Sequence, residues 1–243
     1  MKFIGRHLTL SSLKADLKHY DINAAQVFTK APQQWFGKTL TCGTINYSKD
    51  KYYICAHAGY LINLANRESN SRDALLHEAK RCEYLGIPDL VVHPGSGYKA
   101  DVIRTLLSYG NEWPSSVRLL LENTAGQGKY LGGELSELEN IINNCALPLG
   151  ICYDTAHAWG HGNNVEKDLE HQMIKLIHLN DSAVPFGSKK DRHANLGYGT
   201  MPALLFKHIA DTVTVPCIME TPEPYAKEDL NAYKNLHAHA ECR

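Results

Sequence analysis

The sequence predicts an α/β fold, a single (β/α)8 TIM barrel with its active site at the C-terminal ends of the strands. Three observations support this prediction. Short apolar runs recur at roughly 30-residue intervals with amphipathic segments between them, a repeat that suits strand–helix units. Most of these runs end on a histidine or a carboxylate. The 243 residues contain no linker rich in Pro, Gly or Ser, so we expect residues 1–243 to form one domain.

The apolar runs are the predicted strands, and the amphipathic segments between them are the predicted helices. The strands are Phe3–His7, Ala25–Thr29, Tyr52–His57, Leu90–His93, Val117–Glu122, Leu149–Asp154, Ile174–His178 and Pro216–Glu220. The helices are Ser11–His19, Arg72–Leu85, Asp101–Tyr109, Glu134–Asn144, Met201–Ile209 and Glu228–Leu236. Arg72–Leu85 has the clearest helical period, and Gly86 and Pro88 end it. A doubly wound open sheet would show the same alternation and is the competing architecture.

Composition narrows the class of protein. The formal net charge is −1, so any site for a polyanion has to be local. The seven cysteines form no C-x-x-C pair and are odd in number, which suits reduced thiols inside a cell. The start, MKFIGRHLTL, lacks the apolar core of a signal peptide, and no apolar run reaches transmembrane length. We therefore expect a soluble, intracellular and monomeric protein with no membrane partner.

The residues that end the predicted strands form the most informative pattern. Six strands end on a potential metal ligand, namely His57, His93, Glu122, Asp154, His178 and Glu220. A single histidine at a buried strand end is more often structural, but the C-terminal strand ends of a barrel converge on one pocket. His157 follows Asp154 by three residues, and Asp191 and His193 stand at i and i+2 in a loop. We expect all nine side chains to meet.

A set of histidines and carboxylates without cysteine favours a catalytic zinc, manganese or iron site over a structural zinc site. Nine ligands are too many for one ion and suffice for two or three. Ions about 3.5–4 Å apart stabilise the attacking and leaving oxygens of a phosphodiester, so hydrolysis is the expected chemistry. Lys189, Lys190 and Arg192 add positive charge around the Asp191 loop, which suits a phosphate-bearing partner.

Several separate motifs in the sequence resemble those of a known protein family. They are HAGYLINLAN (57–66), HPGS (93–96), LENTAGQG (121–128), YDTAHAWGHG (153–162), HLNDS (178–182), FGSKKDRHANLGYG (186–199) and METP (219–222). In order, spacing and text they closely resemble the endonuclease IV family of AP endonucleases. MKFIGRH and QVFTKAPQQW resemble the family's N-terminal segments, so the resemblance covers essentially the whole chain.

The resemblance implies a TIM barrel that holds three zinc ions. On ligand chemistry alone, manganese could occupy the least enclosed of these sites. By resemblance, the first zinc is held by His57, His93 and Glu122. The second is held by Glu122, Asp154, His178 and Glu220, and the third by His157, Asp191 and His193. Family members cut double-stranded DNA 5′ to an abasic site, leaving a 3′-hydroxyl and a 5′-deoxyribose phosphate, and many trim blocked 3′ ends. A zinc-activated hydroxide would attack phosphorus, with Glu122 as the bridging catalytic residue.

The resemblance also implies DNA contacts. An enzyme that acts at an abasic nucleotide takes it out of the stack and fills the gap that it leaves. Tyr60 and Leu61 match the family's wedge positions. Gln33 stands where well-known bacterial members carry an arginine, which removes a cation from the wedge. Lys189, Lys190 and Arg192 are further candidates for contact with DNA phosphates.

Two other functions remain open on the sequence. One is a metal-dependent sugar isomerase or epimerase on a related barrel, which usually has a smaller, carboxylate-rich site. The other is a non-catalytic protein that binds damaged DNA. The pair Asp191 and His193 and the basic loop favour the phosphodiesterase. Asn123 and Asp181 closely follow two candidate ligands and are expected to orient them, while His7 is expected to line the pocket.

Overall fold

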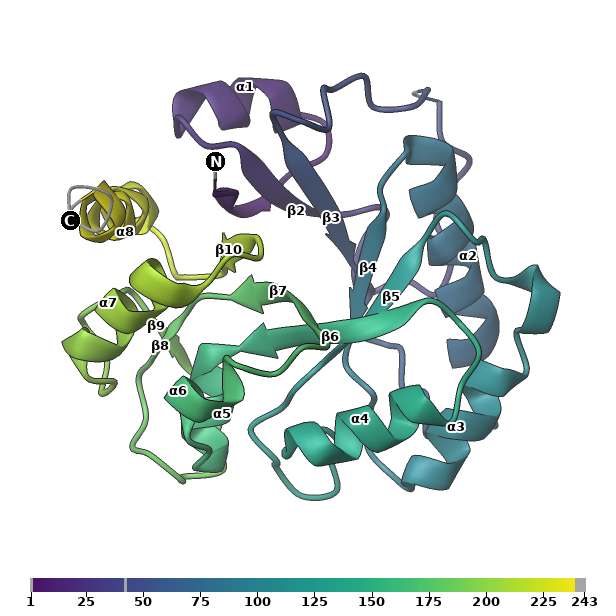
Figure 1. Ribbon diagram of the computed structural model, residues 1–243. Helices are drawn as coiled ribbons and strands as arrows, with labels where there is room; N and C mark the ends of the chain where they lie inside the picture. Colours follow the sequence, from purple (N-terminus) through teal and green to yellow (C-terminus); the bar gives the residue numbers. More distant parts are fainter. Residues whose placement is uncertain (1, 42, 239–243) are drawn as a thin grey trace.

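The chain folds into a closed barrel of eight parallel strands (Figure 1). The structure is a computed structural model and describes residues 2–41 and 43–238, with side chains of the last helix described as far as Leu236. The barrel strands are β1 (Ile4–Leu8), β2 (Ala24–Phe28), β3 (Tyr53–His57), β4 (Asp89–Val92), β5 (Arg118–Glu122), β6 (Leu149–Asp154), β7 (Ile174–His178) and β10 (Cys217–Met219). Each pairs with two neighbours, in the order β1-β10-β7-β6-β5-β4-β3-β2, and β2 returns to β1. The predicted barrel is confirmed and the open sheet is excluded.

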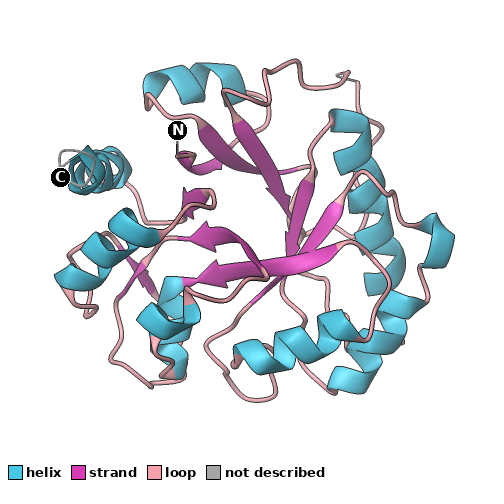
Figure 2. Ribbon diagram, viewed as in Figure 1, coloured by secondary structure: helices cyan, strands magenta, loops and turns pink. Residues whose placement is uncertain are grey.

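Helices surround the barrel on its outside (Figure 2). The predicted helices are all present with shifted ends, as α1 (Leu13–His19), α2 (Ser71–Leu85), α3 (Lys99–Leu107), α4 (Leu135–Asn143), α7 (Ala203–Thr212) and α8 (Ala226–Ala238). Several short elements were not predicted from the sequence. They are the 3-10 turn η1 (Gly110–Glu112), α5 (Thr155–His161), α6 (Val165–Asp168), and the two-stranded sheet of β8 (Asp181–Ser182) and β9 (His193–Ala194). These elements are too short to show a period. In the described part of 29–52, no helix or strand separates β2 from β3.

The middle of the barrel interior is an apolar layer to which each strand contributes one residue. Small and medium apolar residues from seven strands pack together there, namely Ala24, Cys55, Val91, Leu120, Cys152, Leu176 and Ile218. The eighth strand contributes Gly5, which pairs with Ala24 and Ile218. A Cβ on Gly5 would lie 1.8 Å from the carbonyl oxygen of Ala24, so only glycine fits this position. A second, larger apolar layer lies between the strands and the helices.

Strand periodicity determines where the functional side chains lie. Side chains two residues apart on a strand point to the same face. Two residues beyond the interior layer, the eight strand ends carry a polar ring, made of His7, Gln26, His57, His93, Glu122, Asp154, His178 and Glu220. All eight therefore face the barrel axis at its C-terminal end. Every member is polar, in contrast to the apolar layer directly below.

The opposite end of the barrel carries a structural ion pair. Arg118 Nε donates to Asp89 Oδ1 over 2.7 Å, and Tyr53 Oη donates to Asp89 Oδ2 over 2.8 Å. These residues stand at the starts of β3, β4 and β5, away from the polar ring.

The five cysteines that the structure describes are all free, and burial raises the thiol pKa of Cys55, Cys82 and Cys152 well above the usual value. Cys42 and Cys242 lie outside the described residues. Among residues 2–41 and 43–238, no helix is long and apolar enough to span a membrane.

Candidate metal centre

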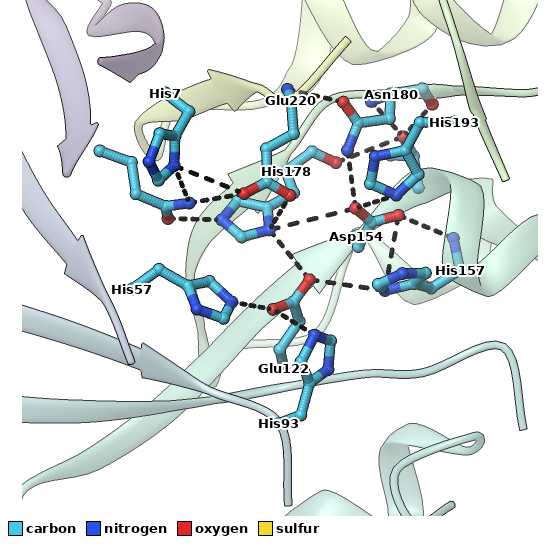
Figure 3. Close-up of polar contacts among 12 residues, drawn as sticks. His7, His57, His93, Glu122, Asp154, His157, His178, Asn180, His193 and Glu220 are labelled. Atoms are coloured by element: carbon cyan, nitrogen blue, oxygen red, sulfur yellow. Dashed lines mark hydrogen bonds and ion pairs between the residues drawn. The ribbon is translucent and has the colours of Figure 1, made fainter. Parts of the chain in front are cut away.

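The structure brings the nine predicted ligands together at the C-terminal end of the barrel, and Figure 3 labels eight of them, all except Asp191. Six come from strand ends or the residue just after a strand. Asp154 is also the N-cap of α5, and its carboxylate accepts from the backbone N–H of His157 over 2.7 Å. Asp191 and His193 come from the loop that folds back as β9. The mouth of the site is a cavity of 530 Å³ lined by His7, Tyr60 and most of these side chains.

The first group consists of His57, His93 and Glu122. Glu122 Oε2 lies 3.1 Å from His57 Nε2 and 3.5 Å from His93 Nε2. The other ring nitrogen of His57, Nδ1, is 2.7 Å from the carbonyl oxygen of Ala58, which can only accept a hydrogen bond. This contact assigns the proton to Nδ1 and leaves the Nε2 lone pair facing Glu122.

The second group consists of Glu122, Asp154, His178 and Glu220. His178 Nδ1 lies 2.9 Å from Glu122 Oε1 and 3.3 Å from Glu220 Oε2. The Nε2 atom of His178 lies 2.8 Å from the side-chain oxygen of Gln26, which fixes the tautomer with Nδ1 free. Glu122 therefore places one oxygen in the first group and the other in the second, as Figure 3 shows.

The third group consists of Asp154, His157 and His193, with Asp191 beside it. His157 Nε2 is 3.2 Å from Asp191 Oδ2, and His193 Nε2 is 3.5 Å from both Asp191 Oδ1 and Asp154 Oδ2. His157 Nδ1 donates to the carbonyl oxygen of Asn123 over 3.0 Å. The family resemblance implied that Asp154 belongs to the second group alone, whereas the structure places it between the second and third groups.

These separations match the spacing of donor atoms around one ion. Four donors at zinc bond lengths of about 2.0–2.1 Å in a tetrahedron lie about 3.3 Å from one another. The distances within the three groups run from 2.9 to 3.5 Å for the closest pairs. His193 Nε2 is buried and has no hydrogen-bond partner among the described residues, although it faces two carboxylates. The donor set therefore fits zinc.

The ionisable groups of the site perturb one another strongly. Burial favours the neutral form of Glu122, but His93 and His178 outweigh this and hold its pKa well below the usual value. Burial also disfavours a charged His178, but Glu220 and Glu122 outweigh it and raise its pKa to about 9. Burial is likewise outweighed at Asp191, where His157 holds the pKa at about 2. Glu122 and Asp191 are thus ionised, and a positive charge is needed beside them.

Two buried amides that the sequence analysis missed orient the predicted ligands. Gln26 donates from Nε2 to Glu220 Oε1 over 2.6 Å, besides its contact with His178. Asn180 donates to Asp154 Oδ2 over 2.7 Å and accepts from the backbone of Glu220. Gln26 could have been noticed from the sequence, because it is a polar residue in the middle of the apolar run AAQVF.

The sequence suggested that Asn123 and Asp181 orient metal ligands and that His7 lines the pocket, and these three predictions fare differently. Asn123 does bind ligand residues, because its side chain pairs with the backbone of Asp154. His7 lines the cavity, as expected, 3.3 Å from the Gln26 amide. The expectation for Asp181 was wrong. Its carboxylate accepts from backbone N–H groups in the following loop, at Gly197, Gly199 and Met201, and so shapes that loop.

The candidate DNA-contacting residues are all exposed at the surface. Tyr60 and Leu61 are 64% and 39% exposed, and both line a cavity that His57, His93 and His157 also line. Gln33 is exposed on the neighbouring loop after β2. In the loop before β9, the exposed side chain of Lys189 donates to the carbonyl oxygen of His161, and Arg192 donates to that of Asp191. Lys190 is exposed as well.

Comparison with known proteins agrees with this geometry. A family model described as a xylose isomerase-like TIM barrel matches residues 15–236. Probable endonuclease 4 of Nitratidesulfovibrio vulgaris (strain DP4) is 32% identical over 274 aligned positions, covering 96% of this chain and 95% of that protein. Apurinic-apyrimidinic endonuclease 1 of Plasmodium falciparum (isolate 3D7) is 31% identical, with 96% of this chain and 46% of that protein covered.

A solved structure agrees as well. Endonuclease IV from Thermus thermophilus superposes with a TM-score of 0.84 at 27% identity, covering 98% of this chain and 100% of that chain. The shared fold thus extends over the same length as the shared sequence motifs. The chain belongs to the xylose isomerase-like TIM barrel family and, within it, to the endonuclease IV family of AP endonucleases.

Proposed function

We propose that this protein is a zinc-dependent AP endonuclease of base-excision repair, acting on double-stranded DNA that contains abasic sites. It cleaves the phosphodiester 5′ to the lesion, leaving a 3′-hydroxyl and a 5′-deoxyribose phosphate, and it trims blocked 3′ ends. The observation that carries the proposal is the set of three donor groups with zinc-like spacing, which line an open cavity beside exposed Tyr60 and Leu61. Relatives named as endonucleases support the substrate class.

The ligands divide among three zinc ions. His57, His93 and Glu122 hold the first. Glu122, Asp154, His178 and Glu220 hold the second. His157, Asp191 and His193 hold the third, with an oxygen of Asp154 close by. Asp191 is only half-buried, so the third site is the least enclosed and the one where manganese would most readily replace zinc.

Bound zinc supplies positive charge that activates water near neutral pH and stabilises charge on the phosphate and the leaving oxygen. The protein's own residues supply position. Glu122 would be the catalytic residue, because its two oxygens reach both the first and second groups and would orient the attacking water. Gln26 and Asn180 keep the ligands of the second group in orientation.

Substrate recognition falls to the loops around the cavity. Tyr60 and Leu61 enter the duplex at the lesion and fill the space of the missing base. Gln33, on the adjacent loop, contributes a hydrogen-bonding group there without a charge. Lys189, Lys190 and Arg192 meet DNA phosphates on the side of the third group. The protein acts as a monomer, since one chain supplies every ligand.

The test is a nicking assay on a duplex with one tetrahydrofuran abasic analogue, with and without a zinc chelator. We expect a single incision 5′ to the analogue that disappears with chelator and returns with zinc. No incision by metal-replete protein would reject the proposal. Metal analysis should give about three zinc ions per chain. One ion per chain would favour a sugar isomerase or epimerase, and three ions with binding but no cleavage would favour a damage-binding protein.

A further inference from the structure

A buried ion pair lies beside the metal centre without contributing to it. Lys30 Nζ is 2.9 Å from Glu78 Oε1, and the two side chains are 2% and 0% exposed. Lys30 follows β2 on the C-terminal side of the barrel, and Glu78 faces it from α2. Neither residue belongs to the three donor groups. A charged pair withdrawn from water in this way requires an explanation, because apolar side chains of similar size fill such space at least as well.

Both partners also bind backbone atoms of the loops that carry the candidate DNA wedge. Lys30 Nζ donates to the carbonyl oxygen of Gln34 over 2.6 Å, which closes the loop on either side of Gln33. Glu78 Oε1 accepts from the backbone N–H of Gly59 over 2.9 Å, immediately before Tyr60 and Leu61. One oxygen of Glu78 thus holds both loops against α2.

The two loops are also joined directly. The backbone N–H of Tyr60 donates to the carbonyl oxygen of Pro32 over 2.9 Å. The two loops pack closely at Gly59, since a Cβ on this residue would lie 2.5 Å from Lys30 Nζ and 2.8 Å from the carbonyl oxygen of Pro32. One turn farther along α2, Arg81 binds the carbonyl oxygens of Thr29 and Lys38. The first loop is therefore held by α2 at both ends.

We propose that the Lys30–Glu78 pair is a positioning device that fixes the loops of Gln33 and of Tyr60 and Leu61 as one rigid wedge. Opening a duplex at a lesion costs unstacking energy. Side chains inserted from loops separate the stacked bases only if those loops keep their conformation when they meet the DNA. The pair acts on DNA distortion and not on the metal ions. This inference rests on the proposed function, because it assumes that the substrate is a duplex that must be opened.

The experiment compares variants of the full-length, zinc-loaded protein. Lys30→Met and Glu78→Gln each remove one charge at nearly constant size. Lys30→Met/Glu78→Met removes both, so no unpaired charge stays buried and the chain should fold even where a single variant does not. Asp89→Asn is the matched control, because it removes the charge of a buried carboxylate that pairs with Arg118 at the opposite end of the barrel.

Three measurements distinguish a role of the Lys30–Glu78 pair in positioning the two loops from a general role in the stability of the fold. Zinc content and circular dichroism report the metal centre and fold. Fluorescence of 2-aminopurine opposite a tetrahydrofuran site reports displacement of that base on binding. Incision kinetics are measured on a fully paired duplex and on one whose lesion lies in a bubble of mismatched bases, where the opening is already made.

We expect the pair variants to keep their zinc, to lose the fluorescence change, and to lose kcat/KM on the paired duplex by about 10- to 100-fold. The bubble substrate should recover most of that loss, and Asp89→Asn should behave as wild type in both assays. Equal losses on both substrates, or a double variant with unchanged fluorescence and incision, would overturn the inference. If the wild-type protein cuts neither substrate, the proposed function itself fails.

Discussion

Nε2 of His178 lies 2.8 Å from the side-chain oxygen of Gln26, within the polar ring at the C-terminal end of the barrel. Both residues are completely buried. The same amide donates to Glu220, so one uncharged side chain orients a histidine and a carboxylate of the second donor group. Gln26 thus orients ligands of the candidate metal centre, although its amide is itself a weak metal ligand.

Replacing Gln26 with leucine, which has a similar volume, should weaken zinc binding at the second group. His178 then loses the acceptor for its Nε2 proton, and Glu220 loses a donor. Loss of such an orienting contact typically lowers metal affinity by about 10- to 100-fold. Competition with a chromogenic chelator measures the change. Gln172→Leu, at an exposed position, is the control, and equal affinities for the two variants would contradict the prediction.

Glu122→Gln should abolish incision while the barrel stays folded. The amide is close in shape to the carboxylate, but it lacks the negative charge that two donor groups share. We expect kcat to fall by at least about 10²- to 10³-fold and less than the wild-type complement of zinc to be retained. Gel-based nicking and metal analysis of the same sample test this. Activity near that of wild type would remove Glu122 from its bridging role.

The ionisation of His178 predicts how pH changes the benefit of zinc. In the metal-free protein its pKa is raised to about 9, from 6.5, so protonation stabilises the fold fully below pH 6.5 and this contribution is lost as pH rises toward 9. Zinc requires neutral histidine, so the loaded protein has no such loss. The difference in Tm between loaded and metal-free protein should therefore increase from pH 6.5 to 9. A difference independent of pH, at fixed free zinc, would contradict this assignment.

Gln33→Arg should tighten binding to an abasic duplex by adding a cation next to the wedge. If the new side chain meets one phosphate, the dependence of log Kd on log salt should steepen by about 0.9. Fluorescence anisotropy over a range of salt concentrations measures both quantities. Gln34→Arg places the same charge on the adjacent exposed residue and should have a smaller effect. Unchanged affinity for Gln33→Arg would show that this loop does not approach DNA.

Much of the site was accessible from the sequence because strand ends in a barrel converge. The residues His57, Glu122 and His178 each end an apolar run, so their position followed from the fold class alone. The same period-2 argument would have found Gln26, which stands two residues beyond Ala24 just as the expected pocket residue His7 stands two residues beyond Gly5. Gln26 was missed because an uncharged amide inside a strand does not suggest metal chemistry.

The remaining features depend on contacts between segments distant in sequence, which no local pattern reports. The link between Lys30 and Glu78 joins residues 48 positions apart. Asp181 was expected to orient a metal ligand, yet it binds backbone groups 16 to 20 residues ahead. The short helix α5 was missed because its seven residues are too few to show a helical period. It begins directly at the end of β6, so no loop marks where it starts.

The shared carboxylates have a consequence for how the site tolerates change. Glu122 belongs to the first and second groups, and Asp154 belongs to the second and third. A substitution at either residue therefore removes a donor from two groups at once, whereas a substitution at His93 removes a donor from one. Damage to a shared carboxylate should spread across the site, and damage to a histidine of one group should stay local.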